Sequence, residues 1–244
     1  MSDGSDNLCV AAVGDLHVHQ SSADGLQHLF ENISQDADVL ALCGDLTHLG
    51  LPQEAERLAA DLRFCRVPVV AVLGNHDHQN GFAEDIKKIL RASKVVMLDE
   101  AETFEIKGVG FAGTKGFCGG FDKHMLAPFG EDAIKQFVNE AVKESLRLEV
   151  ALNSLRTDKI VVVLHYSPIA ATVVGEPPEI FPFLGSSRLA ETIDHFDVNA
   201  VFHGHAHLGS YQGKTTKGTP VYNCCMQLLQ NIRPERPYAL VEIG

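Results

Sequence analysis

The chain has 244 residues, of which 45% are hydrophobic and 21% charged, a composition typical of a soluble globular protein rather than a disordered, fibrous or membrane-spanning one. Its 20 Lys and Arg residues stand against 32 Asp and Glu residues, and the formal charge of −12 argues against a broad basic surface for nucleic acid or anionic lipid. The six cysteines have no CxxC spacing, which indicates reduced thiols. With no signal peptide or membrane span recognisable, we expect a cytoplasmic protein.

In the first half of the chain, short apolar runs alternate with amphipathic stretches, and this alternation predicts an α/β fold built from βα units. Amphipathic helices are expected around 26–33, from Pro52 to Leu62 and around 82–90. The strands predicted in this half are Leu8–Val13, Val39–Cys43, Val67–Leu73, Lys94–Leu98, Thr103–Lys107 and Val109–Gly113.

The second half begins with a glycine-rich stretch, 113–130, which predicts a surface loop that either overhangs the functional site or is simply exposed. A long helix is expected from Ile134 to Leu155, and a proline-rich loop over 175–185. Further strands are predicted at Ile160–Leu164, Ala200–Phe202, Thr219–Asn223 and Tyr238–Ile243. Because no repeat or linker interrupts the pattern, we expect one domain over residues 1–244.

Polar clusters occur where five of the predicted strands end. They are Asp15-Leu-His17, Gly44-Asp45, Gly74-Asn75-His76-Asp77, His165 and Gly204-His205-Ala-His207. Because ligand sites in open α/β sheets lie beyond the carboxyl ends of the strands, these clusters are expected to converge. This set of carboxylates, an amide and several imidazoles, without a thiolate, suits first-row transition metals. It contains more ligands than one ion requires. The sequence therefore predicts two metal ions that share a carboxylate and hold a bridging hydroxide for in-line attack at phosphorus.

The motifs Asp-x-His, Gly-Asp, Gly-Asn-His-Asp, His and Gly-His-x-His, in this order over residues 13–207, resemble those of the calcineurin-like metallophosphoesterase superfamily. The resemblance implies a β-sandwich of two mixed sheets flanked by helices, four layers in all (αββα), with a binuclear centre at the C-terminal edge of the strands. It implies two divalent ions such as Mn, Fe or Zn. One would be bound by Asp15, His17, Asp45 and His207, and the other by Asp45, Asn75, His165 and His205.

Within the same resemblance, His76 is not a metal ligand but faces the substrate phosphate, where it stabilises the transition state or protonates the leaving oxygen. Asp77 either orients the His76 imidazole or caps the helix that follows. The sequence lacks the Asp-Arg pair and the Gly-Asn-His-Glu motif of the Ser/Thr phosphatases. It is closer to the small bacterial phosphodiesterase branch.

The predicted function is hydrolysis of a phosphodiester or phosphomonoester in a small substrate such as a nucleotide. A nuclease of the same superfamily is one alternative, which the acidic charge and the lack of a basic stripe disfavour. A metal-free scaffold is another, which the complete set of ligand positions disfavours. The sequence carries no signal for the oligomeric state.

Overall fold

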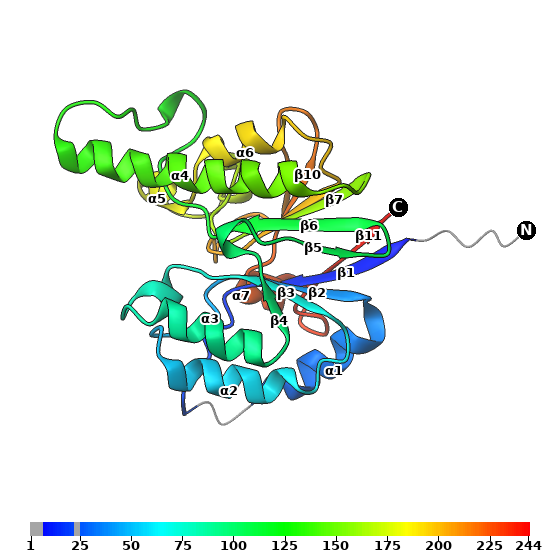
Figure 1. The fold of residues 1–244 in the computed structure, drawn as a ribbon. Helices are drawn as coiled ribbons and strands as arrows, with labels where there is room; N and C mark the ends of the chain where they lie inside the picture. Colours follow the sequence, from blue (N-terminus) through cyan, green and yellow to red (C-terminus); the bar gives the residue numbers. More distant parts are fainter. Residues whose placement is uncertain (1–6, 22–24) are drawn as a thin grey trace, which may run out of the picture.

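Two mixed sheets form the centre of the computed structural model, which describes residues 7–21 and 25–244 (Figure 1). The five-stranded sheet has the order β11 (Ala239–Ile243), β1 (Leu8–Val13), β2 (Val39–Cys43), β3 (Val69–Val72) and β4 (Val95–Met97). In this sheet β1 to β4 are parallel, and β11 joins β1 antiparallel. The six-stranded sheet has the order β5 (Phe104–Ile106), β6 (Val109–Thr114), β7 (Lys159–Leu164), β8 (Ala200–His203), β10 (Pro220–Asn223) and β9 (Gln212–Lys214).

Helices cover the outer face of each sheet and confirm the four-layer αββα arrangement (Figure 1). The helices on the five-stranded sheet are α1 (Gln27–Asp36), α2 (Pro52–Leu62) and α3 (Ala83–Ala92). Those on the six-stranded sheet are α4 (Asp132–Ser154) and α6 (Ser187–Ile193). The short helices α5 (Phe181–Leu184) and α7 (Met226–Ile232) lie in the connections. Single 3₁₀ turns occupy His76–His78, Asp99–Ala101, Asp122–His124, Ala170–Thr172 and Pro178–Ile180.

The central strands are apolar on both faces because each sheet is packed on both sides. In β2, Val39 and Ala41 pack between the two sheets, whereas Leu40 and Leu42 pack under the helices of the outer layer. In β7, Val161 likewise belongs to the core between the sheets, while its neighbours face α4 and α6. Continuous apolar runs of this kind are what strands buried on both faces require.

Several predicted boundaries differ from the structure. The third strand begins at Val69 rather than Val67, and β6 continues to Thr114. The segment 113–130 is only partly a surface loop: Cys118 and Phe121 are buried, whereas residues 122–124 and 126–130 are exposed. Cys118 packs in the core beneath α4, which explains why this half of the segment cannot be solvated.

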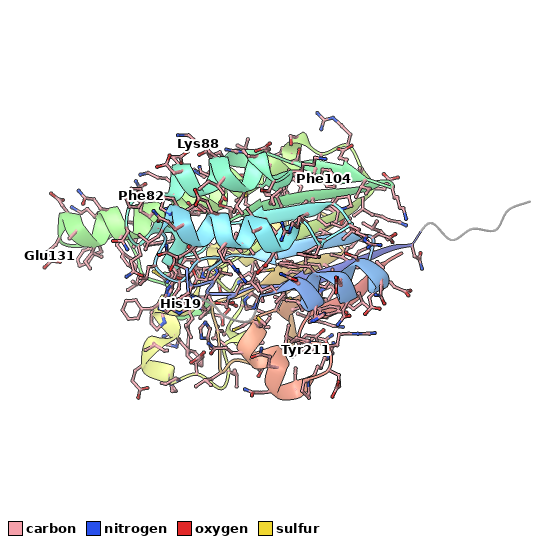
Figure 2. The ribbon with its side chains drawn as sticks, turned by 90° about the horizontal axis from the view of Figure 1, so that it is seen from below. His19, Phe82, Lys88, Phe104, Glu131 and Tyr211 are labelled. Carbon is pink, nitrogen blue, oxygen red and sulfur yellow. The ribbon has the colours of Figure 1, made fainter. Side chains whose placement is uncertain are left out.

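The parallel strands of both sheets place their carboxyl ends at one end of the molecule. Figure 2 shows His19, which follows β1, at the same end as Phe82 before α3, with Phe104 of β5 toward the opposite end. This arrangement brings the polar loops that follow β1, β2, β3, β7 and β8 together. Among the residues that the structure describes, no helix is both long and apolar enough to cross a membrane.

Candidate metal centre

Backbone hydrogen bonds join the loops that carry the site. The amide of Asp15 donates to the carbonyl oxygen of Gly44 at 2.9 Å, and the amide of His17 donates to that of Asp45 at 3.0 Å. On the other sheet, the amide of Gly204 donates to the carbonyl oxygen of His165 at 3.1 Å. These bonds continue the strand pairing past the sheet edge, so the loops hold their side chains in fixed register.

Glycines and residues with unusual backbone conformations leave room for the carboxylates of the site. A Cβ on Gly74 would lie 2.2 Å from Oδ1 of Asp45, and a Cβ on Gly204 would lie 2.3 Å from Oδ2 of Asp15. Residues held at positive φ are uncommon, and they cluster where function needs a particular geometry. Those at this site are Asp15 (57°), His17 (43°), Asp45 (49°) and His205 (70°).

The first donor group consists of Asp15, His17 and His207, whose ligand atoms all lie within 4.8 Å of one another. Nε2 of His207 is 3.0 Å from Oδ1 of Asp15. The backbone amide of His205 donates to both oxygens of Asp15, at 3.0 and 2.9 Å. The carboxylate is therefore oriented by backbone from the opposite sheet.

The second donor group consists of Asp45, His165 and His205, again within 4.8 Å. Nε2 of His165 lies 3.4 Å from Oδ1 of Asp45 and 2.9 Å from Oδ1 of Asn75. Oδ2 of Asp45 lies 3.9 Å from Nε2 of His17, a member of the first group. One carboxylate thus faces both donor groups.

The electrostatics of the site reflect its burial. Burial, together with the charges of Asp15 and Asp77, raises the pKa of Asp45 to about 9. Burial also acts to raise the pKa of Asp15, but its hydrogen bond with His207 and the surrounding imidazoles lower it to about 2. Burial lowers the pKa of His17 to about 4. The imidazole is therefore neutral, as a metal ligand must be.

Two features of the polar atoms fit a bound cation. Both ring nitrogens of His17 are buried and have no hydrogen-bond partner among the described residues. His165 must donate its Nδ1–H to the carbonyl oxygen of Cys43 at 2.9 Å, so its neutral ring turns an Nε2 lone pair toward Oδ1 of Asn75. These two atoms, Nε2 and Oδ1, are 2.9 Å apart and both carry lone pairs. That separation suits two ligands of one ion, since Zn–N and Zn–O bonds are about 2.0–2.2 Å. The donor set therefore fits divalent metal.

His76 has a fixed orientation at the edge of the two groups. Its Nδ1–H is donated to the carbonyl oxygen of His48 at 2.6 Å, and its Nε2 lies 3.9 Å from Oδ2 of Asp45. The amide of His76 also donates to Oδ1 of Asp45 at 2.8 Å. The ring is thus oriented by the backbone of residue 48 and turned toward the shared carboxylate.

Asp77 has neither of the two roles expected from the sequence. Its carboxylate accepts hydrogen bonds from the amides of Leu46, Thr47 and Gly74 and from the Thr47 hydroxyl, at 2.6 to 3.2 Å. The position next to Nδ1 of His76 is taken by the carbonyl of His48, and the residue before α3 is Phe82. Asp77 is fully buried and ties the loop after β2 to the turn after β3.

His48 and His19 were not among the predicted site residues. Ring nitrogens of His17, His48 and His76 lie within 4.8 Å of one another, and the His19 and His48 ring centroids are 3.8 Å apart. No motif spacing marks either residue, because His48 acts through its backbone carbonyl and His19 lies beyond the Asp-x-His motif.

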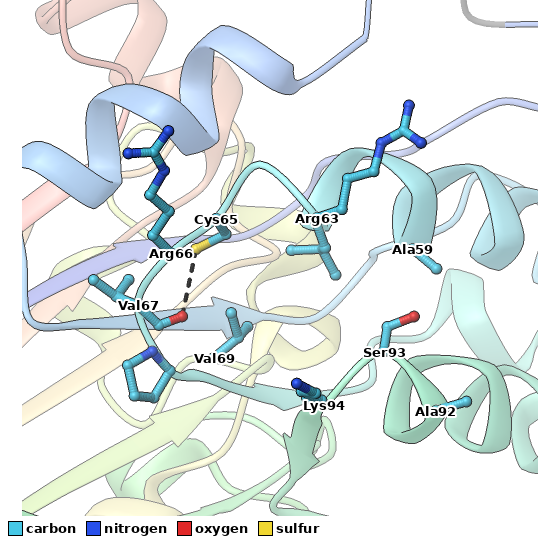
Figure 3. A pocket seen from close by; sticks show the side chains of 11 residues that line it. Ala59, Arg63, Cys65, Arg66, Val67, Val69, Ala92, Ser93 and Lys94 are labelled. Atoms are coloured by element: carbon cyan, nitrogen blue, oxygen red, sulfur yellow. Dashed lines mark hydrogen bonds between the residues drawn. The ribbon is translucent and has the colours of Figure 1, made fainter.

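An open pocket of about 460 Å³ lies over the donor groups, and Asp45, Asn75, His76, His205 and His207 form its floor. A larger cavity of about 560 Å³ lies at the opposite end of the strands, between the C-terminal ends of α2 and α3 (Figure 3). In Figure 3 the side chains of Arg63 and Arg66 extend away from each other. No metal donor is among its described lining residues, so that cavity is separate from the metal centre.

The four-layer sandwich with His and Asp donors at the strand ends fits a metal-dependent phosphoesterase, and a family comparison shows that class. The profile of the calcineurin-like phosphoesterase family matches residues 9–209. The chain belongs to the calcineurin-like phosphoesterase family and is a hydrolase of phosphoric esters. Proteins of this family use divalent metal ions. A comparison with curated proteins finds no match.

Solved structures share the fold at low sequence identity. Phosphopantetheinyl hydrolase from Mycobacterium tuberculosis is 14% identical with a TM-score of 0.69, over 98% of this chain and 97% of that one. The protein TT1561 of Thermus thermophilus is 16% identical with a TM-score of 0.60, over 98% and 100% of the two chains. A putative 5'-nucleotidase from Staphylococcus aureus is 16% identical with a TM-score of 0.52, over 89% of this chain and 48% of its own.

Proposed function

We propose that this protein hydrolyses a phosphodiester or phosphomonoester of a small molecule with two divalent transition-metal ions. The observation that carries the proposal is the placement of Asp45 between the two donor groups, 3.4 Å from Nε2 of His165 and 3.9 Å from Nε2 of His17. The residues that would hold the ions are Asp15, His17, Asp45, Asn75, His165, His205 and His207. When bound, such a pair of ions would supply a water activated as a nucleophile and would polarise the phosphoryl oxygens.

The chain itself prepares this chemistry by fixing its donors. Asp15 is held by the backbone amide of His205, and Asp45 by the amide of His76. His165 is oriented by donating its Nδ1–H to the carbonyl oxygen of Cys43. This arrangement is common among metal-bound histidines, whose other ring N–H donates to an acceptor. Little reorganisation is then needed when substrate binds.

His76 is the group that we place next to the substrate phosphate. With Nδ1–H donated to the carbonyl of His48, Nε2 faces the pocket side of Asp45. A protonated Nε2 can donate to a phosphoryl oxygen or transfer its proton to the leaving oxygen. Asp77 supports the same site by holding the loop that carries Asp45.

The test is turnover of 4-nitrophenyl phosphate and bis(4-nitrophenyl) phosphate by metal-free protein titrated with manganese, with bound metal measured in parallel. We expect activity to rise as two metal ions bind and to be lost in Asp45→Asn. Diester preference would define a phosphodiesterase, and monoester preference a phosphatase. Protein that binds two metals and hydrolyses neither ester nor other small phosphoesters would overturn the proposal, and protein that binds no metal would favour a scaffold.

A further inference from the structure

The walls of the 460 Å³ pocket differ chemically from its metal-binding floor. Beyond the donor residues and His76, the lining consists of one carboxylate, one amide and three aliphatic side chains: Glu176, Gln227, Ile180, Leu184 and Leu208. Among the residues that the structure describes, neither Arg nor Lys contributes to this lining. An enzyme for doubly phosphorylated substrates would need positive charge here, because a second phosphate has to be paired when it leaves water.

Glu176 is fixed in place by the turn that carries it. Its Oε1 accepts the backbone N–H of Leu208 at 2.7 Å, and its own N–H donates to the carbonyl oxygen of Val173 at 3.1 Å. Gly175 precedes it with φ of 121°, and a Cβ at that position would lie 2.0 Å from the Leu208 carbonyl oxygen. The turn therefore packs directly on the backbone of residues 208 and 209.

The second carboxylate oxygen of Glu176 remains available to a ligand. No hydrogen bond or ion pair to Oε2 occurs within residues 7–21 and 25–244. The side chain is half-buried, and His205 and His207 line the same pocket. Glu176, Ile180 and Leu208 line the same pocket as the metal donors, so a substituent on a phosphoryl group held by those donors can reach this carboxylate.

Charge and polarity of the walls together restrict that substituent. The bound cations would pair with the phosphoryl group, and beyond them an anionic substituent would meet Glu176 with no Lys or Arg in the described lining, whereas a cationic one would form an ion pair with it. The aliphatic side chains of Ile180, Leu184 and Leu208 suit a short run of methylene groups between the phosphate and the charge.

We propose that Glu176 selects phosphodiesters in which the alcohol other than the leaving group carries an ammonium group. This inference rests on the proposed hydrolytic function of the site. Glu176 is a specificity-determining residue here, since it binds the substituent and not the reacting atoms. Nucleoside diphosphates and nucleic acid strands, with further phosphates beyond the reacting one, are excluded by the same charge.

The first test compares the 2-aminoethyl and propyl esters of 4-nitrophenyl phosphate, which have the same leaving group and nearly the same shape. In both, the water–phosphorus bond forms as the bond to 4-nitrophenolate breaks. We expect kcat/KM to be about 3- to 5-fold higher for the aminoethyl ester with the native protein. The preference should vanish in Glu176→Gln, in which the side-chain carbonyl can still accept from Leu208. It should persist in Glu179→Gln, an exposed carboxylate nearby that does not line the pocket.

The second test measures binding without catalysis. Calorimetric titration of the metal-loaded protein with 2-aminoethylphosphonate and propylphosphonate, which contain a stable P–C bond, should give a Kd ratio of similar size that depends on Glu176. Equal binding of the two phosphonates, or a preference that survives Glu176→Gln, would overturn the inference. If neither ester is hydrolysed but the phosphonates bind selectively, the hydrolytic function fails and the role of Glu176 stands. If both esters are hydrolysed at equal rates, the hydrolytic function stands and the role of Glu176 is overturned.

Discussion

The backbone carbonyl oxygen of His48 accepts the Nδ1–H of His76 at 2.6 Å, across 28 residues of sequence. Because a carbonyl can only accept, this contact fixes which nitrogen of His76 is free, and the free Nε2 lies 3.9 Å from Oδ2 of Asp45. The loop after β2 therefore supplies both the shared carboxylate and the group that orients the imidazole beside it. An imidazole held in this way can act on a bound phosphate while the metal donors stay in place.

Replacing His76 should slow the reaction without removing metal. In His76→Ala we expect kcat to fall by about 100-fold or more, the usual contribution of a positioned acid or base, with two metal ions still bound. The loss should be larger for alkyl than for aryl leaving groups, since poorer leaving groups depend more on protonation. Steady-state kinetics and metal analysis check both points. His78→Ala, on the exposed part of the same turn, is the control. An unchanged kcat in His76→Ala would remove His76 from the reaction.

We expect the replacement of Asp77 to lower the stability of the fold rather than to act directly on the reaction. Asp77→Ala leaves the amides of Leu46, Thr47 and Gly74 without their acceptor. We expect a loss of about 3 kcal/mol in the free energy of unfolding, measured in urea, and a Tm lower by about 6–12 °C. Thr47→Val removes only one of the donors and should cost about 1 kcal/mol. Equal effects of the two substitutions would contradict the central role of the carboxylate.

The fold was largely predictable because buried parallel strands produce continuous apolar runs in the sequence. The runs at Leu8–Val13 and Val39–Cys43 coincide with β1 and β2, since both faces of these strands are covered. The strand β9, Gln212–Lys214, was missed because an edge strand with exposed ends has no apolar pattern. Pro68 interrupts the third predicted strand, because it has no N–H to donate.

The candidate site was predictable only where function depends on side chains at strand ends. Asp15, Asp45 and His165 each follow a strand, and topology brings them together. The contribution of His48 lies in its carbonyl, which any residue would provide. The position of Glu176 depends on a contact with Leu208, 32 residues away, in a loop without periodicity. Such information appears only when the chain is folded.

Asp99 provides a pH test away from the metal centre. Burial raises its pKa to about 7, the charge of Glu144 adds to this, and the Leu73 amide, Lys87 and Lys115 act in the opposite direction. The folded protein therefore keeps a proton that the unfolded chain releases near pH 4. By linkage, the contribution of this group to stability is greatest below about pH 4 and is lost as pH rises to about 7.

The substitution Asp99→Asn should relieve this cost, since the amide oxygen can still accept from Leu73. We expect the variant to be more stable than the native protein at pH 8 by an amount on the order of 2 kcal/mol, and the gain to shrink toward pH 5. Urea unfolding at pH 5, 6, 7 and 8 measures the trend. The matched control is Asp85→Asn, on the exposed face of α3, which should give no such pH dependence. A gain that is constant with pH would mean that the charge of Asp99 is not its origin.

Metal removal should destabilise the protein through its unpartnered donors. Within the part of the chain that the structure describes, the two buried ring nitrogens of His17 have no hydrogen-bond partner, and a bound cation would compensate for their burial. Adding manganese or zinc to chelator-treated protein at about 100 times Kd should stabilise it by about 2.7 kcal/mol per site, or a Tm increase of roughly 5–10 °C.

In His17→Ala, metal analysis should show that the site with Asp15 and His207 is weakened while the other still fills. His28→Ala, on the exposed side of α1, should behave as the native protein. A full Tm increase with two tightly bound ions in His17→Ala would show that His17 is not a ligand, and its buried nitrogens would then need another partner.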